Sequence, residues 1–574
     1  MTLYRFVAEI TVVIDGIGTQ QTRLFASAGW CTRPGDTPAN APVDGRLKSP
    51  GSFRRELFSG SRVFGAVRPS YGELVLQNSD GALDEWADYG LSGGKVVVRM
   101  GPADGAYPSD YTTVYIAYAH SIIADFAEIR IRLRDRLQAL DRPLVTQSFA
   151  GTGGIEGGGD LVGKLKQWVS SDPYLIPITL VDHTIQLYHV QSTASGGLGA
   201  YFKIYEGGIE IPADAGSYAN VADLLANQPT LGHCKWYFGA EGVYVRLRGV
   251  PQFDLRAIAF GFDPTTGGAF TVASLAGQAG ISGGVAPIAI GALLVDDSRS
   301  YLDVCQDAAL SQIAHFGMTR LDVLQGGTVT APSVSPIAEF HVHNTCNLSR
   351  ASALDMDAPV WSVTVHSGKR WPGNVASGAP ADIAGQVQRT PWYATFAREV
   401  PAIRTANPGA VSTVVEVQAR AVQSVLSQTD YLDKYFALFG VRRAFYSFDV
   451  PLTAQNLAIE LHDTVSLRMP RFGLDAGKAF RVGFLTNITN AKAMVFALAF
   501  LPQYVPAGFN LTLGIIIFGM IWVTISTSWY MLIVAAINKA HAWLQKPKVR
   551  RGLTAVSGIG IFILAIGLVI SPAK

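Results

Sequence analysis

The sequence is poor in charge and in cysteine. Asp, Glu, Lys and Arg make up 16% of the 574 residues, against about 25% in an average protein. Four cysteines are too few for a secreted fold built on disulfides. A net charge of +2 gives no electrostatic basis for binding nucleic acid. Because 49% of the residues are apolar, the chain can bury a large core, which excludes a disordered protein.

Acidic residues are absent from the last part of the chain. Residues 481–574 contain eight basic residues and no Asp or Glu, so they carry a net charge of +8, whereas residues 1–480 carry −6. The length alone predicts several domains. The difference in composition predicts that one of these domains, 481–574, is of a different kind from the others.

Two uncharged runs in this last domain are long enough to cross a membrane. Residues 511–537 contain no charge over 27 positions, and residues 553–570 contain none over 18. A spanning helix needs about 20 such residues, and a soluble core helix is seldom apolar on every face. The two runs therefore predict transmembrane α-helices, with residues 483–574 in contact with the lipid bilayer.

A third candidate span, residues 482–505, has a weaker pattern. It is interrupted by polar side chains and by a proline, namely Asn487, Asn490, Lys492 and Pro502. The alternative is an interfacial or re-entrant segment. We therefore expect two to three transmembrane helices.

Basic residues predict the orientation of these helices. Five of them lie between the two strong candidate spans, at Lys539, Lys546, Lys548, Arg550 and Arg551. The positive-inside rule places this loop in the cytoplasm. With three spans, residues 1–480 would also be cytoplasmic. Residues 1–10 lack the pattern of a secretory signal, which agrees with that expectation.

Residues 483–505 read GFLTNITNAKAMVFALAFLPQYV and are followed by a long apolar run, a short basic loop and a glycine-containing apolar run. Over about 479–574 the chain resembles the C-terminal half of LysE/RhtB-type amino-acid exporters, although Ala491 stands where that family has proline. The resemblance implies that polar groups of the first segment line a transport path. The matching candidates are Asn487, Asn490, Lys492 and Pro502. Half an exporter would need another half, or an oligomer, to enclose a path.

Alternation of apolar and polar residues is the main pattern in residues 1–480. It is clearest at 128–134 (EIRIRLR), which predicts an antiparallel strand with solvent-facing arginines. Other strands are expected at 2–15, 62–67, 72–77, 95–100, 361–366 and 444–450, with a hairpin at 457–469. Helices are expected at 82–89, 219–227, 301–315 and 410–438, the last broken near Asp430. The predicted fold class is α+β, mostly antiparallel β modules, with domains at 1–150, 151–330 and 331–480.

Three blocks in residues 1–482 have a distinctive sequence. They are residues 59–101 (SGSRVFGAVRPSYGELVLQNSDGALDEWADYGLSGGKVVVRMG), 151–168 (GTGGIEGGGDLVGKLKQW), and 461–465 with 470–478 (LHDTV and PRFGLDAGK). In this order they resemble tail-tip and baseplate-hub proteins of tailed phages and prophages. The resemblance implies β-barrel modules related to tail-tube subunits, a homo-trimeric ring, and tube, fibre or tip proteins as partners.

Candidate sites for chemistry are weak. Residues 158–165 approach the phosphate-binding pattern GxxxxGK[ST], but Leu165 replaces the magnesium-binding hydroxyl. His341, His343 and Cys346 could ligate a metal, but no further ligand has suitable spacing, and two polar residues on an exposed strand are the simpler interpretation. The four cysteines form no CxxC motif, and Cys305 fits the apolar face of a helix. We expect no cofactor, no metal and no enzymatic activity.

The two resemblances overlap at residues 480–484, as expected for a fusion of two coding sequences. The sequence therefore predicts a structural protein of a phage or prophage tail tip or baseplate hub, fused to membrane-spanning helices and located in the virion tail or the host inner membrane. The alternative is an integral inner-membrane LysE-type amino-acid exporter, or half-transporter, with a large cytoplasmic domain.

Overall fold

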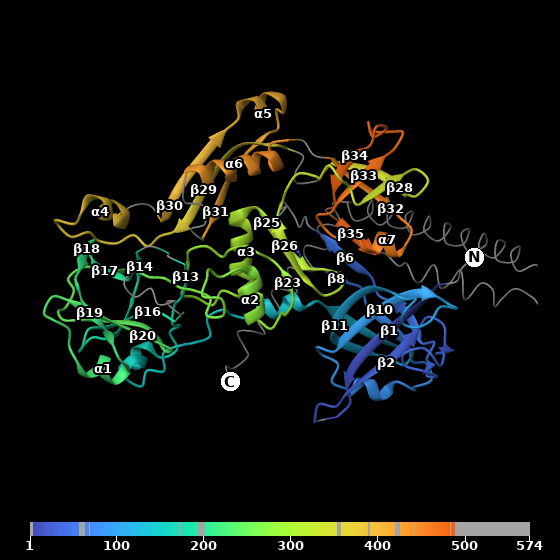
Figure 1. Ribbon diagram of the computed structural model, residues 1–574, viewed down its shortest axis with the longest axis horizontal. Coiled ribbons are helices and arrows are strands. Elements are labelled where there is room, and N and C mark those ends of the chain that lie inside the picture. The colour runs from blue at the N-terminus through green and yellow to red at the C-terminus, as the bar shows by residue number, and fades with distance from the viewer. Residues whose placement is uncertain are drawn as a thin grey trace, which may run out of the picture. The chain divides into compact units, whose positions relative to one another are not determined.

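The computed structural model describes residues 4–487, apart from 16, 57–63, 68, 172, 174, 193–200, 353–357, 389–390, 419–424, 442–443 and 483 (Figure 1). The chain divides into two compact units, Met1–Ile488 and Thr489–Lys574. The candidate spans 511–537 and 553–570 lie outside the described residues. Within the described ranges, no helix has both the length and the apolar character needed to cross a membrane.

The chain begins with a seven-stranded antiparallel sheet. Its strands, in spatial order, are β2 (Gln20–Ala26), β1 (Tyr4–Val13), β10 (Lys95–Pro102), β11 (Thr112–Ala124), β12 (Glu128–Arg134), β9 (Leu74–Gln77) and β5 (Leu47–Pro50). Strand β12 has the predicted bounds, with Ile129 and Ile131 buried and Arg132 exposed. A separate two-stranded sheet is formed by β3 (Trp30–Cys31) and β4 (Pro42–Val43). The 3₁₀ helix η1 (Asp84–Ala87) lies between β9 and β10 in the sequence. The expected helix at 82–89 is therefore shorter, and its Trp86 is fully buried in the core.

Residues 135–330 contain several smaller sheets. They are β13 (Trp168–Ser170) with β24 (Leu293–Val295); β14 (Ile176–Pro177), β22 (Leu255–Ile258), β17 (Lys203–Glu206) and β18 (Ile209–Ile211); and β15 (Thr179–Asp182), β16 (Leu187–Gln191), β21 (Gly242–Leu247), β20 (Cys234–Gly239) and β19 (Ala213–Tyr218). Short 3₁₀ helices lie at η2 (Arg136–Asp141), η3 (Gly154–Glu156) and η4 (Gly159–Leu161). The α-helices are α1 (Val221–Ala226), α2 (Val272–Gln278) and α3 (Tyr301–Gln312). Helix α1 confirms the helix expected at 219–227.

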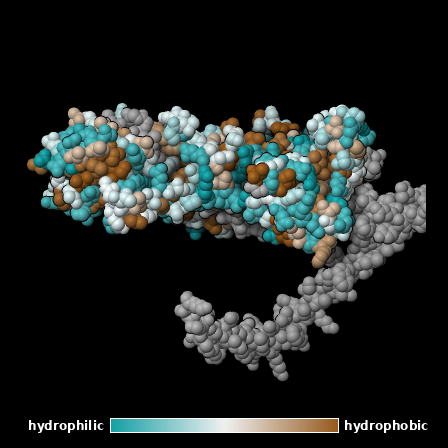
Figure 2. Space-filling view, turned by 90° about the horizontal axis from the view of Figure 1, so that it is seen from below, coloured by the Kyte–Doolittle hydropathy of each residue, from teal (hydrophilic) through white to brown (hydrophobic). Residues whose placement is uncertain are grey.

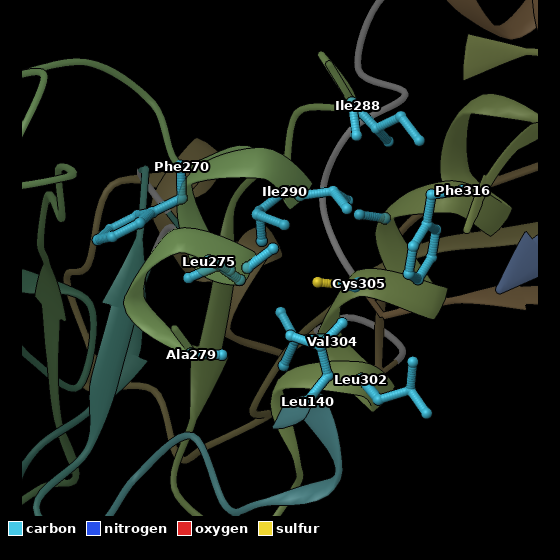
Figure 3. Close-up of a cluster of buried hydrophobic side chains, with 14 of the residues drawn as sticks. Leu140, Phe270, Leu275, Ala279, Ile288, Ile290, Leu302, Val304, Cys305 and Phe316 are labelled. Carbon is cyan, nitrogen blue, oxygen red and sulfur yellow. The ribbon is translucent and has the colours of Figure 1, made fainter. Parts of the chain in front are cut away.

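Helices α2 and α3 form the largest apolar cluster of the described residues. Figure 3 shows side chains of this cluster, among them Leu275 of α2, Val304 and Cys305 of α3, and Phe270 and Ile290. Ser300 and Asp303 close the N-terminal end of α3 as a capping box, which fixes where the helix begins. The helix ends three residues earlier than expected, because the chain turns into strand β25 (Ala314–Met318).

A three-stranded sheet and one long helix form the next part. Strand β29 (Val360–Lys369) lies between β30 (Trp392–Glu399) and β31 (Val411–Val417), and α6 (Val425–Phe439) packs on it through Tyr431 and Tyr435. The predicted helical region 410–438 is therefore wrong in its first part. Residues 411–417 (VSTVVEV) are rich in β-branched residues and form a strand parallel to β29. Helix α6 continues through Asp430 without a break. The short helices α4 (Ala381–Gln388) and α5 (Pro401–Ala406) flank this part in the sequence.

The predicted hairpin at 457–469 is also wrong. Helix α7 (Ala454–Leu457), capped by Thr453, occupies the start of that range. Strand β33 (Thr464–Arg468) instead pairs with β34 (Lys478–Arg481) and, in parallel, with β27 (Ala338–His341). The loop between β33 and β34 is the PRFGLDAGK block. Strand β28 (Cys346–Ser352) pairs with β32 (Ala444–Asp449), close to the expected strand.

Segments on the two sides of the expected domain boundaries near 150 and 330 share sheets and apolar clusters. Strand β7 (Gly65–Val67) adds in parallel to β25, in a sheet that also holds β26 (Leu324–Thr328) and β23 (Gly284–Val285). Ile313, directly after α3, is fully buried in the apolar cluster of β29 and α6. These contacts join distant segments into the single unit Met1–Ile488.

The visible surface of the described residues is mixed in polarity. In Figure 2, hydrophobic residues form separate patches among hydrophilic ones. Such a pattern is usual for a protein face in contact with water.

The four cysteines provide a test of the core. Cys31 and Cys346 are exposed, whereas Cys234 and Cys305 are buried, and burial raises the pKa of both buried thiols to about 12. At pH 8 the buried thiols therefore contain almost no reactive thiolate. We expect a chromogenic disulfide reagent to titrate two thiols in the folded protein and four in guanidinium chloride. A third thiol that reacts as fast as the exposed pair would contradict the packing of β20, which contains Cys234, or of α3, which contains Cys305.

Candidate functional site

The last described strand contains one of the four candidate transport residues. Strand β35 (Phe484–Asn487) pairs antiparallel with β6 (Phe53–Glu56), whose other neighbour is β8 (Ser70–Tyr71) (Figure 1). Asn487 lies opposite Phe53 in this register. The first residues of the candidate span 482–505 thus form a sheet strand rather than the start of a helix.

Only one of the four predicted transport residues, Asn487, lies among the described residues. Asn490, Lys492 and Pro502 lie outside the described residues. Asn487 belongs by its backbone to the first compact unit, Met1–Ile488, which we call the β-rich unit. The other three candidates belong to the second unit, Thr489–Lys574. A path that uses all four residues stays a prediction.

Strand β35 lies beside a group of buried and partly buried charged and aromatic side chains that we call the junction. Its members come from β6, from β25 and the turn after it, and from the loop after α7. They are Arg55, His315, Arg320, Glu460, His462 and Asp463. The junction therefore joins segments that are up to 400 residues apart in the sequence.

A buried ion pair forms the centre of the junction. Arg55 pairs through Nη1 with Oε2 of Glu460, and only 3% of the Arg55 side chain and 18% of the Glu460 side chain are exposed. Arg320 Nε lies 4.0 Å from the other carboxylate oxygen of Glu460. Burial raises the pKa of Glu460 and lowers that of Arg320, because both charged forms lose hydration.

The loop 460–463 is hydrogen-bonded to Val482, two residues before β35 begins. The Glu460 amide donates to Oδ2 of Asp463 at 2.7 Å, which shapes the loop. His462 N donates to Val482 O at 2.8 Å, and Val482 N donates to Asp463 O at 2.9 Å. The His462 ring stacks on His315, with centroids 4.5 Å apart and planes at 10°. The chain therefore enters β35 from a fixed position.

The ion pair stabilises the arrangement of the segments that meet at the junction. A buried ion pair is costly to form but strongly destabilising to break, because one unpaired charge is then left in the interior. The junction thus holds strand β6, strand β25 and the loop 460–463 in one arrangement. Among residues that the structure describes, no group of three or more His, Cys, Asp or Glu could hold a metal ion.

The other sequence candidates have structural positions. His341 ends strand β27 and His343 lies in the following turn, so the two do not share a strand face as expected. In the glycine-rich block, Gly151 has φ +70°, and a Cβ there would lie 2.3 Å from Val162 Cγ2. Glu156 accepts from Lys166 Nζ at 2.6 Å. The block is therefore a tight turn held by contacts between its own residues.

Sequence reasoning did not identify the junction. Its residues come from three distant segments and have no common spacing. Arg55 and Glu460 are also of residue types that are mostly exposed to solvent, so neither is expected in the interior from its type alone. The only usable signal is that the LHDTV block, which resembles tail-hub proteins, contains His462 and Asp463.

Comparison with known proteins finds matches to both parts of the chain. A family model described as LysE type translocator matches residues 457–572. The uncharacterized membrane protein YrhP of Bacillus subtilis (strain 168) is 26% identical over 81 residues, which are 14% of this chain. The chain spans 39% of the length of this curated relative. The matched range begins within the β-rich unit, before β33.

Solved structures similar to the chain include two tail proteins. The tail protein from Neisseria meningitidis MC58 is 9% identical, with 84% of this chain and 91% of that chain covered and a TM-score of 0.35. The 43 kDa tail protein of prophage MuSo2 from Shewanella oneidensis is also 9% identical, with 84% and 93% covered and a TM-score of 0.34. Both resemblances noted in the sequence thus recur among these matches.

The ion pair at the junction can be tested by removing its negative charge. Glu460→Gln leaves Arg55 buried without a counter-charge, and we expect it to lower the free energy of unfolding by about 3 kcal/mol. The matched control is Glu73→Gln, which breaks the exposed pair with Arg132 and should cost at most about 1 kcal/mol. Denaturant unfolding of the purified full chain measures both. Equal effects would show that the junction does not hold the unit together.

Proposed function

We propose that residues 1–488 are a structural component of the tail tip or baseplate hub of a phage or prophage, and that the following segment attaches this component to a membrane. The observation that carries the proposal is the position of the three tail-hub-like blocks. Block 59–101 includes strands β7, β9 and β10. Block 151–168 forms the tight glycine turn. The last block, 461–465 with 470–478, contains the start of β33 and the loop that leads to β34. All three are framework parts of one compact unit.

The way in which the unit is joined supports a structural role. Strand β7, from the first block, completes the sheet of β25 and β26. The ion pair of Arg55 with Glu460 joins the beginning and the end of the same unit. A tail component must hold its shape while neighbouring proteins are attached to it. Contacts between segments far apart in the sequence, such as these two, make local unfolding of either segment less favourable. The role requires no catalytic side chain.

The partners follow from this role. We propose tube, fibre or tip proteins of the tail and two further copies of the chain, arranged as a trimeric ring. For the segment after Ile488 the partner is a lipid bilayer, because residues 511–537 and 553–570 are uncharged and long enough to span it. The protein would then be located in the virion tail or at the host inner membrane.

The second candidate function is transport of amino acids as a LysE-type exporter or half-transporter. The match to the LysE type translocator family over residues 457–572 favours it. Against it, the strands β33, β34 and β35 of the β-rich unit lie within that match, and less than half of the curated relative is spanned. Transport would therefore need a second half-transporter or an oligomer.

Two chains test the first proposal. We expect the full chain to stay in the membrane pellet after alkaline carbonate, because its apolar runs are embedded in lipid. We expect a chain ending at Ile488, which keeps β35, to be trimeric by size exclusion with light scattering. A monomer at micromolar concentration would contradict the hub role, and release of the full chain by carbonate would contradict membrane attachment.

A further inference from the structure

We propose that residues 149–164, which we call the glycine loop, form an acid-sensitive lid that opens when the buried side chain of His189 takes up a proton. The glycine loop contains most of the block 151–168, and His189 lies on strand β16 against the base of the loop. Opening would uncover the apolar surface of the neighbouring sheet. The lid does not depend on the tail role proposed above.

The glycine loop is closed at its base. The amide of Phe149 donates to the carbonyl of Lys164 at 2.9 Å, and the amide of Gly163 donates to the carbonyl of Phe149 at 3.0 Å. Inside the loop, the amide of Gly151 donates to the carbonyl of Glu156 at 2.9 Å. A compact loop whose ends meet and whose polar groups bond to one another can move away from its support as one unit.

The contact between the glycine loop and the sheet is largely apolar. Phe149, Ile155 and Leu161 of the loop belong to one apolar cluster with Tyr244 of β21 and Leu187 of β16. The hydroxyl of Tyr244 also donates to the carbonyl of Ile155 at 3.3 Å. Strands β16 and β21 are paired with each other independently of the loop. The loop can therefore open while the strand ladder beneath it stays intact.

His189 lies where the base of the glycine loop meets the sheet. Its side chain is fully buried. The ring centroid lies 5.4 Å from that of Phe149, with the planes at 89°, and 5.0 Å from that of Tyr244. Neither ring nitrogen meets the geometry of a hydrogen bond with a described residue. A positive charge on this ring would be far more costly than the neutral form, because the surroundings offer it little solvation.

The charged groups on the loop side disfavour a protonated histidine. Lys166 Nζ lies 5.3 Å from the ring centroid of Phe149 and forms an ion pair with Glu156 at 2.6 Å. Lys164 is the second cation that acts on His189. The carboxylate of Glu156 is thus engaged by a lysine, and the two cations repel a positive ring.

The titratable groups on the sheet side are engaged as well. Tyr244 lies on β21, and Glu241, in the turn between β20 and β21, accepts from the hydroxyl of Tyr237 at 2.7 Å. The neighbouring strand β15 contains Asp182, whose carboxylate accepts from the amide of Thr184 at 2.7 Å. Protonation of the histidine therefore introduces a charge that these groups do not neutralise in place.

The titration of His189 sets the direction of the response. Burial, and then the positive charge of Lys166, lower the pKa of His189 to about 3, against an opposite effect of the Gln191 backbone. An exposed histidine has a pKa of about 6.5. The closed loop thus binds fewer protons than the open loop, so the closed form loses stability as the pH falls from about 6.5 toward 3. The ratio of closed to open molecules then falls about tenfold for each pH unit.

The two nearby glutamates keep their charge in most of this window. Partial burial acts to raise the pKa of the Glu156 carboxyl, but the hydrogen bonds from Lys166 and Ala150 outweigh it, and the pKa is lowered. The hydrogen bond from Tyr237 lowers the pKa of the Glu241 carboxyl. Both carboxylates therefore stay ionised down to about pH 4.5, and above that pH the response of the loop comes from His189.

Hydrogen exchange of the full chain in detergent, followed by mass spectrometry at pH 7.5 and 4.5, tests the lid. After correction for the intrinsic exchange rates, we expect protection of peptides from the glycine loop to fall by about 100-fold at pH 4.5. Peptides from β16 and β21 should keep their protection. Unchanged protection of the loop, or an equal loss in the loop and in both strands, would overturn the proposal on the unmodified chain alone.

Three variants test whether His189 is the cause. His189→Asn keeps a polar side chain that takes up no proton, and His189→Leu replaces it by an apolar one. We expect the pH response of the loop to shrink to less than about threefold in each variant that is closed at pH 7.5. The matched control is His183→Asn, which removes an exposed histidine six residues away and should keep the full response.

A response that persists in both His189 variants, or that disappears in His183→Asn, would show that another group opens the loop and would overturn the proposal. The light-scattering test of the trimer is made at neutral pH, where the loop is closed. Failure of the lid therefore leaves the tail role untouched, and a monomeric chain leaves the lid untouched.

Discussion

The pairing of β35 with β6, next to the buried ion pair of Arg55 and Glu460, is the constraint on which the rest of the structure depends. Strand β6 is near the beginning of the chain and β35 is at the end of the β-rich unit. Bringing these two strands together reduces the conformational entropy of the chain, and this cost grows only slowly with the number of residues between them. The closure is held by a strand ladder, by two backbone hydrogen bonds of Val482 and by a desolvated ion pair. The unit therefore includes residues that their sequence assigns to the membrane segment.

The sequence predicted the elements with strong local periodicity. The strand 128–134 has the expected bounds, because an alternation of Ile and Arg suits only a strand with one buried face. Helix α1 and the start of α3 are marked by capping residues, Asn220 and Ser300. The two resemblances were also visible, because each depends on contiguous residues.

The errors arose where tertiary contacts decide the conformation. Residues 411–417 are a strand because β29 offers a partner, which no local window shows. Ile313 adopts φ +51°, unusual for a β-branched residue, because its side chain is needed in the core of β29 and α6. Phe484–Asn487 form a strand although their sequence resembles the start of an exporter segment, because Glu56–Phe53 pair with them. The junction was not predictable, since its members come from three segments that lie far apart in the sequence.

The β-rich unit ends after β35 and not before it. The most direct measurement is the unfolding midpoint of two chains, one ending at Val482 and one at Ile488. Two to four extra backbone hydrogen bonds at about 1 kcal/mol each predict that the longer chain is more stable by about 2–4 kcal/mol. Equal midpoints would show that residues 484–487 contribute nothing to the unit and belong to the segment that follows.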